Sequence, residues 1–152
     1  MKKIHAEDIY KPIREWVIPA DQVAHVQIGN PLEHALLVLI KTGYSAIPVL
    51  DSSYHLKGQI SKTLILDFAL GLERIEFEKL EEHVVEEVMR TDIPHVKEDE
   101  QLLDALKLLI DHNFLSVVDN NGYFTGILPR SAILKFLNHY LREKNRETVG
   151  QK

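Results

Sequence analysis

The sequence predicts an α/β (α+β) protein in which one β-α-β-β-α unit occurs twice. The first observation behind this prediction is an internal repeat, because apolar residues of one segment recur about 70 residues later. The second is that apolar spacing within each copy changes from helical to extended. The third is Asn120-Asn121-Gly122, which separates two extended runs and favours a hairpin because Asn-Gly accepts a positive φ.

The two copies of the repeat align with each other at two different sequence offsets. His25-Val26 aligns with His95-Val96 at an offset of 70 (95 − 25), and the apolar residues of the next helix coincide in that frame. Val49 aligns with Val117 at an offset of 68 (117 − 49), and the frame continues through the hairpin into the second helix. The second copy is therefore two residues shorter just after its first helix, where "GYSAIPV" becomes "NFLSV".

In the first copy, an extended segment around 23–28 precedes a helix that begins at Asn30-Pro31-Leu32-Glu33. Asn30 is a good N-cap, Pro31 suits the first helical position, and Glu33 can close a capping box. Gly43 is predicted to end this helix, because glycine adopts the left-handed conformation found just past a helix. The elements predicted to follow are a strand at 46–50, a turn at Asp51-Ser52-Ser53, a strand at 57–60 and a helix at about 62–70 that stops at Gly71.

The second copy predicts the same order. Its elements are an extended segment at 93–97, a helix at about 99–112, a strand at 114–118, a strand at 123–128 and a helix at about 130–145. The segment between the copies is charged and helix-prone. The predicted organisation is an N-terminal helical segment at 1–16, repeat 1 at 17–71, a helical connector at 72–87, repeat 2 at 88–141 and a polar tail at 142–152.

Composition excludes several classes of function. A net charge of −5 disfavours a broad nucleic-acid-binding face, so we expect no DNA partner. No apolar run reaches the roughly 20 residues of a membrane span, and the N-terminus lacks a signal-peptide core, so we expect a cytoplasmic protein. The absence of cysteine excludes disulfides and thiolate zinc sites. The scattered histidines form no metal motif, and no P-loop or nucleophile elbow occurs, so we expect no metal, no cofactor and no enzyme.

The stretch "GYSAIPV" combines an aromatic, two small residues and a proline where a helix meets a strand. Tyr44 offers a π-face on which a purine can stack, and small Ser45 and Ala46 let backbone groups approach a ligand. Pro48 removes one ladder donor, which favours an edge or irregular segment. The alternative is that Tyr44 and Ile47 belong to the core and Pro48 only marks a strand edge.

From about residue 17 to 141, this arrangement resembles tandem CBS domains (cystathionine-β-synthase domains). The resemblance implies two repeats paired about a pseudo-twofold axis as one module, with clefts between them. Such modules usually form homodimers and bind adenosine nucleotides in the clefts, with the base beside the position of "GYSAIPV".

Three stretches of the sequence resemble one particular group of CBS proteins. "ADQVAHVQIGNPLEHALLVLIKTGYSAIPVLD", "GLERIEFEKL" and "TDIP" resemble the small stand-alone CBS proteins of Firmicutes that bind cyclic di-AMP, the CbpB or DarB type. That resemblance implies a ligand site in the inter-repeat cleft. Its residues would be Gln22, Ala24, Tyr44, Ser45, Ala46, Arg130 and Ser131. Gln22 stands where the family often has Lys, and Ser131 stands where it has a second Arg.

In the wider family, a hydroxyl residue after the hairpin contacts phosphate, and an Asp three residues later holds the ribose. Ser61 keeps the hydroxyl in the first copy, but Leu64 occupies the Asp position. In the second copy Pro129 and Ala132 occupy the two positions. Both ribose carboxylates are therefore absent, which disfavours AMP or ATP. A 3′,5′-cyclic dinucleotide has no free vicinal diol to be held in that way.

The resemblance implies a regulatory module that senses cyclic di-AMP and modulates a protein partner, such as a (p)ppGpp synthetase/hydrolase. Two alternatives stay open. One is an energy sensor that binds AMP, ADP or ATP, and the other is a constitutive dimeric scaffold whose clefts are vestigial.

Overall fold

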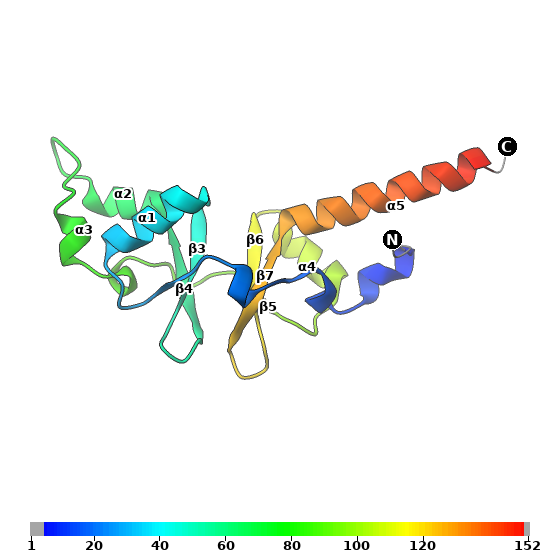
Figure 1. Ribbon diagram of the computed structural model, residues 1–152, viewed down its shortest axis with the longest axis horizontal. Helices are drawn as coiled ribbons and strands as arrows, with labels where there is room; N and C mark the ends of the chain where they lie inside the picture. Colours follow the sequence, from blue (N-terminus) through cyan, green and yellow to red (C-terminus); the bar gives the residue numbers. More distant parts are fainter. Residues whose placement is uncertain (1–4, 151–152) are drawn as a thin grey trace. The chain divides into compact units, whose positions relative to one another are not determined.

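The computed structural model describes residues 5–150, so expectations for residues 1–4 and 151–152 lie outside the described chain. The chain divides into two compact units (Figure 1). Unit 1 comprises residues 1–21, 94–119 and 125–152, and unit 2 comprises residues 22–93 and 120–124.

Unit 2 is built on a three-stranded sheet in the order β2-β3-β4. β2 (Val26–Gln27) runs parallel to β3 (Ala46–Leu50), and β3 is antiparallel to β4 (Leu56–Ser61). Two helices, α1 (Leu32–Thr42) and α2 (Lys62–Ala69), bury their apolar stripes against this sheet. The core they form contains Val26, Leu32, Ala35, Leu39, Ile47, Val49, Ile60, Ile65, Ala69, Leu80 and Val85.

The connector is less helical than its composition predicts. Within 72–87 the structure has only α3 (Lys79–Glu82) and the 3-10 turn η4 (Val85–Glu87). Leu80 and Val85 are both buried in the core of unit 2. Burying these two side chains requires the segment to follow the surface of the unit, and this packing prevails over local helix propensity.

The sequence prediction for α1 is wrong at its N-terminal end and correct at its C-terminal end. Asn30 is not the N-cap, because its Oδ1 accepts the Gln27 N–H at 2.8 Å and Pro31 precedes the helix instead. Asn30 thus stabilises the turn before the helix. The prediction for Gly43 is confirmed: it has a φ of 79° and its N–H donates to the Leu39 carbonyl at 3.0 Å.

Pro48 lies in β3, the central strand, so the prediction of an edge strand is wrong. The alternative, an irregular segment, agrees with the shift in the β3–β4 register between Val49 and Leu50. Opposite it, the Gln59 N–H and C=O both bond with Arg90, each at 2.9 Å. Gln59 therefore turns its backbone groups away from Pro48, and the nitrogen of Pro48 faces the β2 side. There β2 pairs only with Val49 and Leu50, so the missing N–H of Pro48 lies beyond the end of β2.

The two hairpins place a residue with positive φ at equivalent positions, since 122 − 54 is the repeat offset of 68. Gly122 has a φ of 84°, which glycine adopts without strain. Tyr54 has a φ of 69°, which is costly for a side chain of this size. Its ring contacts His25 edge-on, with centroids 5.5 Å apart. Asp51 supports the same turn by accepting the Ser53 and His55 N–H groups at 2.9 Å, and the His55 bond contributes most to lowering the pKa of Asp51.

Unit 1 contains a four-stranded sheet in the order β1-β7-β6-β5. Its strands are β1 (Ile18–Pro19), β5 (His95–Lys97), β6 (Phe114–Val118) and β7 (Phe124–Pro129). Its helices are α4 (Leu102–Leu109) and α5 (Arg130–Gly150), with 3-10 turns η1 (Ala6–Tyr10) and η2 (Ile13–Trp16); a third turn, η3 (Ala20–Gln22), ends at the start of unit 2. The core contains Ile13, Val96, Leu102, Ala105, Leu109, Leu115, Val117, Leu128, Ile133 and Phe136.

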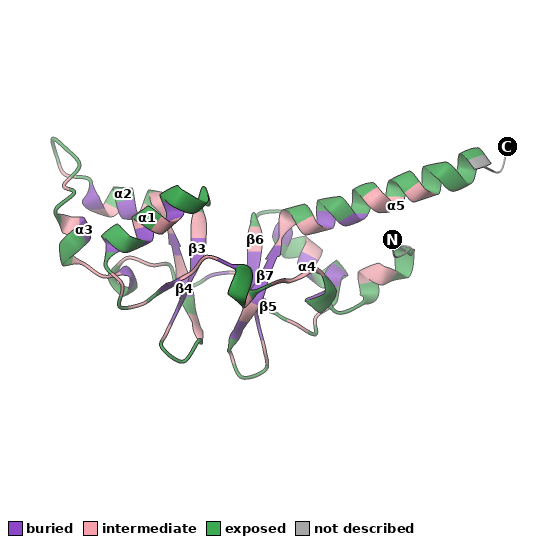
Figure 2. Cartoon of the chain, in the orientation of Figure 1, coloured by how far each residue is buried: buried purple, intermediate pink, exposed green. Residues whose placement is uncertain are grey.

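β1 joins this sheet although it comes from the start of the chain. Ile18 pairs with Ile127 and Pro19 with Gly126. A Cβ on Gly126 would clash with the Ile18 carbonyl, so glycine allows this close approach. α5 also extends beyond its predicted end at 145, and Figure 2 shows that its last turns are largely exposed.

Replacing Gly43 with Ala is expected to lower the free energy of unfolding by about 1–2 kcal/mol, the cost of a Cβ in the left-handed region. No atom lies within 4 Å of a Cβ at this position, so the loss reports backbone strain alone. Urea denaturation followed by circular dichroism measures it. Gly29→Ala is the matched control, because Gly29 is exposed, has open space and lacks a positive φ. Equal stabilities for the two variants would contradict the assignment.

Candidate functional site

Residues 43–45 connect α1 to β3, which begins at Ala46. After the left-handed Gly43, Tyr44 is 48% exposed, whereas Ile47 is 1% exposed and packs in the core of unit 2. Ser45 is exposed and Ala46 is half-buried. The core interpretation therefore holds for Ile47 and not for Tyr44, whose ring has a surface available to a ligand.

Gln22 and Ala24 come just before β2. Gln22 is exposed, and Ala24 is half-buried against the same core. In the parallel pair, Val26 lies opposite Val49. Ala24 packs against the core that also contains Ile47 of β3. The segment 44–46 lies at the edge of the sheet where β3 begins.

The start of α2 lies at the same edge. Ala46 pairs with Ser61, and the Lys62 N–H donates to the Ser45 carbonyl at 3.1 Å. Ser61 is the N-cap of α2, with its Oγ accepting the Leu64 N–H at 3.1 Å. The hydroxyl that sequence comparison suggested for phosphate binding therefore has a structural role, although its own hydrogen remains a donor.

Arg130 and Ser131 open α5 in unit 1. The Arg130 N–H donates to the Asn113 carbonyl at 2.8 Å, which is the equivalent of the Lys62–Ser45 bond at the repeat offset of 68 (130 − 62). Ser131 is exposed. Five of the predicted site residues therefore occupy the place where the helix after the hairpin meets the beginning of the first hairpin strand: Tyr44, Ser45 and Ala46 in unit 2, and Arg130 and Ser131 in unit 1.

The guanidinium of Arg130 has a contact that sequence reasoning missed. Its Nε donates to the Leu109 carbonyl at 2.8 Å, and its Nη2 donates to the Ile110 carbonyl at 3.2 Å. Arg130 is half-buried and caps the C-terminal end of α4. A cation is favourable there because the C-terminal end of a helix carries partial negative charge.

The two-residue difference between the copies accounts for this cap. Leu39 in α1 is equivalent to Leu109 in α4 at the offset of 70 (109 − 39). The Leu39 carbonyl is bonded by the N–H of Gly43, whereas the Leu109 carbonyl is bonded by the side chain of Arg130. The shorter second copy has no glycine at its helix end, and the arginine supplies the missing donor. The sequence indicates the need for another donor at the end of α4 by the absence of a glycine equivalent to Gly43. This absence is visible only when the two copies are aligned.

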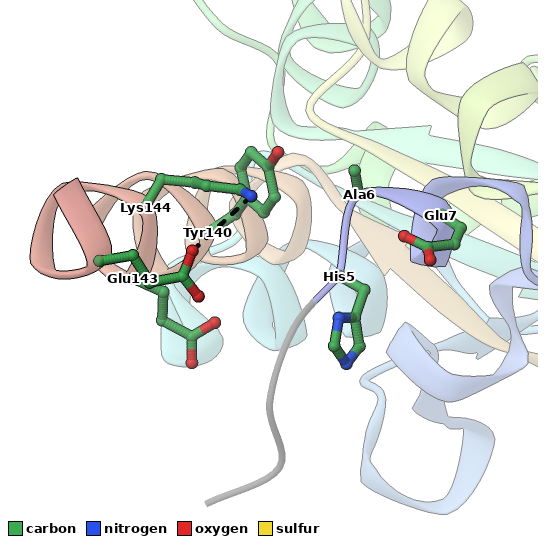
Figure 3. A pocket seen from close by; sticks show the side chains of 7 residues that line it. His5, Ala6, Glu7, Tyr140, Glu143 and Lys144 are labelled. Atoms are coloured by element: carbon green, nitrogen blue, oxygen red, sulfur yellow. Dashed lines mark ion pairs between the residues drawn. The ribbon is translucent and has the colours of Figure 1, made fainter. Parts of the chain in front are cut away.

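Two hollows occur elsewhere in unit 1, and neither contains a predicted ligand residue. One, of about 210 Å³, is lined by Glu7, Tyr140, Glu143, Lys144 and Glu147 among others (Figure 3). Its carboxylates would repel a phosphate. The other, of about 320 Å³, has both Arg14 and Glu98 among its lining residues. Opposite charges on that wall do not favour an anionic ligand.

Residues 5–150 contain neither a metal-binding cluster nor a membrane-spanning helix. In that part of the chain no three His, Cys, Asp or Glu side chains are grouped so as to hold a metal ion. Of the helices between residues 5 and 150, none has the length and apolarity that crossing a bilayer requires.

Arg130→Ala should lower the free energy of unfolding by about 1–2 kcal/mol, because two charge-assisted bonds to α4 are lost from a partly exposed site. Urea denaturation measures the change. Lys62→Ala is the matched control: it alters the equivalent residue of the first copy, where Gly43 already satisfies the Leu39 carbonyl, and should stay within about 0.5 kcal/mol of the parent. Similar losses in both variants would refute the capping role.

Comparisons with known proteins agree with this architecture. The CBS domain family model matches residues 13–71 and again 85–139. Cyclic di-AMP receptor B of Bacillus subtilis is 49% identical over 134 residues, which cover 88% of this chain and 91% of the relative. The crystal structure of the Listeria monocytogenes CbpB protein in complex with c-di-AMP is 51% identical with a TM-score of 0.80, covering 86% of this chain and 97% of that one.

A CBS domain-containing protein of unknown function from Bacillus anthracis is also similar, with 57% identity and a TM-score of 0.81 over 87% of this chain and 97% of that one. The two matched domains cover most of the sequence. The chain belongs to the CBS-domain family and carries two CBS domains in tandem.

Proposed function

We propose that this chain is a regulatory module that binds cyclic di-AMP. The observation that carries the proposal is its 49% identity, along nine-tenths of both chains, to a protein named cyclic di-AMP receptor B. A solved relative at 51% identity contains c-di-AMP itself, which supports the same ligand. Both relatives are matched over almost their whole length, so the resemblance is not confined to one domain.

Tyr44 is proposed to stack on an adenine base. Nearly half of its surface is exposed, and Gly43 holds it at the end of α1 without burial in the core. Base stacking on an aromatic ring contributes roughly 1–3 kcal/mol. Ser45 and Ala46 are small, so the backbone beside the ring is open to the edge of the base. Ala24 and Gln22 are proposed to complete the contacts of unit 2.

Arg130 is proposed to contact a phosphate, with Ser131 beside it. A guanidinium has five N–H groups, so its two bonds to α4 leave donors for an anion. Leu64 and Ala132 occupy the positions that hold ribose hydroxyls in the wider family, and neither can accept a hydrogen bond with its side chain. That difference favours a cyclic dinucleotide over AMP, ADP or ATP.

The remaining parts of the proposal concern assembly and signalling. We propose that the protein is a cytoplasmic homodimer without catalytic activity, in which ligand occupancy changes binding to a protein partner such as a (p)ppGpp synthetase/hydrolase. Apolar side chains exposed on α1, on α2 and at the residue just after α2 support self-association, namely Leu37, Ile40, Leu66 and Leu70. A particle of twice the 17.5 kDa chain mass in light scattering would agree with a dimer.

Isothermal titration against cyclic di-AMP, cyclic di-GMP, AMP and ATP tests the ligand. We expect the tightest binding for cyclic di-AMP, with one molecule per chain, because the second copy lacks a counterpart of the "GYSAIPV" segment. Tighter binding of AMP or ATP would instead identify an energy sensor. No binding of any nucleotide would favour a constitutive scaffold, and two ligands per chain would refute the single site.

Tyr44→Ala should weaken cyclic di-AMP binding by roughly 1–3 kcal/mol, because the stacked base loses its platform. Its melting temperature should change little, since Tyr44 is outside the core. Ile47→Ala provides the contrast: it removes a buried side chain and should lower the free energy of unfolding by about 2–5 kcal/mol. A Tyr44→Ala protein that melts early yet binds normally would overturn the assignment.

A further inference from the structure

We infer that Arg130 couples ligand binding to the segment 109–113, which joins α4 to β6. The inference rests on the proposed function, because it takes the phosphate of cyclic di-AMP as the anion that Arg130 contacts. Its other premise is the set of bonds that this residue makes within unit 1. Arg130 is then a positioning residue for the segment as well as a ligand contact.

Arg130 bonds to both ends of this segment. The backbone N–H of Arg130 bonds to Asn113 at 2.8 Å, and the guanidinium bonds to Leu109 and Ile110 at 2.8 and 3.2 Å. These bonds attach both ends of the segment to the start of α5. The equivalent segment of the first copy is stabilised by its own backbone through Gly43, so it does not depend on a side chain from α2.

The geometry of the guanidinium allows it to bind both groups at once. Nε and Nη2 lie on one edge of the planar group, and these are the two atoms that bond to α4. The other edge presents Nη1 together with the second hydrogen of Nη2. An edge of this kind binds a phosphate bidentately. The carbonyls of α4 therefore orient the group and leave the opposite edge for the ligand.

Because α4 orients the Arg130 side chain before the ligand binds, phosphate binding and the state of the segment 109–113 are thermodynamically linked. A side chain already fixed by α4 loses less conformational freedom when phosphate binds. Because coupling is reciprocal, the bound phosphate must favour the held state of the segment by the same factor. Ile110 lies in this segment with 70% of its surface exposed. Ligand binding should therefore order a segment that presents an apolar side chain to solvent.

Amide hydrogen exchange of the full-length protein, with and without saturating cyclic di-AMP, tests the link. We expect exchange in the segment 109–113 to slow about fivefold or more on binding. In Arg130→Ala this response should vanish even at ligand concentrations that saturate the variant, and affinity should fall about ten- to a hundredfold. Exchange of the free variant should already be faster in this segment.

Arg130→Lys guards against a variant that does not fold. A lysine keeps the charge but lacks the planar guanidinium with its two hydrogen-bonding edges. The variant should therefore retain part of the affinity for cyclic di-AMP and lose the slowing of amide exchange in 109–113. Lys62→Ala, the equivalent change in the first copy, should leave the response intact.

The outcomes separate the two proposals. If the parent protein binds cyclic di-AMP but exchange in 109–113 is unchanged, faster, or slowed equally in Arg130→Ala, the coupling is wrong and the proposed function stands. If the parent protein does not bind cyclic di-AMP, the proposed function fails and the coupling fails with it.

Discussion

Each copy of the repeat depends on one backbone hydrogen bond that closes its β-α-β-β-α unit. The N–H of the residue that begins the second helix donates to the carbonyl just before the first hairpin strand, from Lys62 to Ser45 and from Arg130 to Asn113. The bond continues the hairpin ladder by one step and fixes where the helix begins. It also brings the helix start to the segment that leaves the preceding helix. Every proposed ligand contact except Gln22 and Ala24 belongs to one of these two junctions or is adjacent to it.

Much of the fold follows from local patterns in the sequence. Strands 46–50 and 114–118 are found where they were predicted, because an apolar run between turn signals is a strong local indication. Gly43 was also predictable, since the left-handed end of a helix almost requires glycine. The exposure of Tyr44 was not, because a tyrosine beside a core strand fits both a buried and a ligand-facing position. The assignment of ligand contacts to individual residues remains a prediction.

The differences from prediction arise where distant segments decide the outcome. Asn30 had the local features of an N-cap, yet the Gln27 N–H competes for its side chain. Pro48 suggested an edge because proline lacks a donor, but β2 is so short that a central strand tolerates it. β1 joins the sheet of unit 1 through pairing with β7, more than 100 positions along the chain. No local propensity carries information about such a pairing.

The ends of α1 and α4 show how the same structural requirement can be met by different chemical groups in two similar units. A helix that turns sharply into a strand leaves carbonyls that need donors. The first copy meets this need with backbone, through Gly43, and the two extra residues there leave Tyr44 exposed. The second copy is two residues shorter and has no glycine at the end of α4, so the side chain of Arg130 bonds to the Leu109 carbonyl instead. The end of α4 therefore has a cation beside it, whereas the end of α1 is followed by the aromatic ring of Tyr44. In the proposed function these are the two chemical groups that a cyclic dinucleotide requires, a surface for its base and a charge for its phosphate. The asymmetry between the copies is thus a consequence of how each helix ends, and it explains why one chain with two similar units is expected to bind a single ligand.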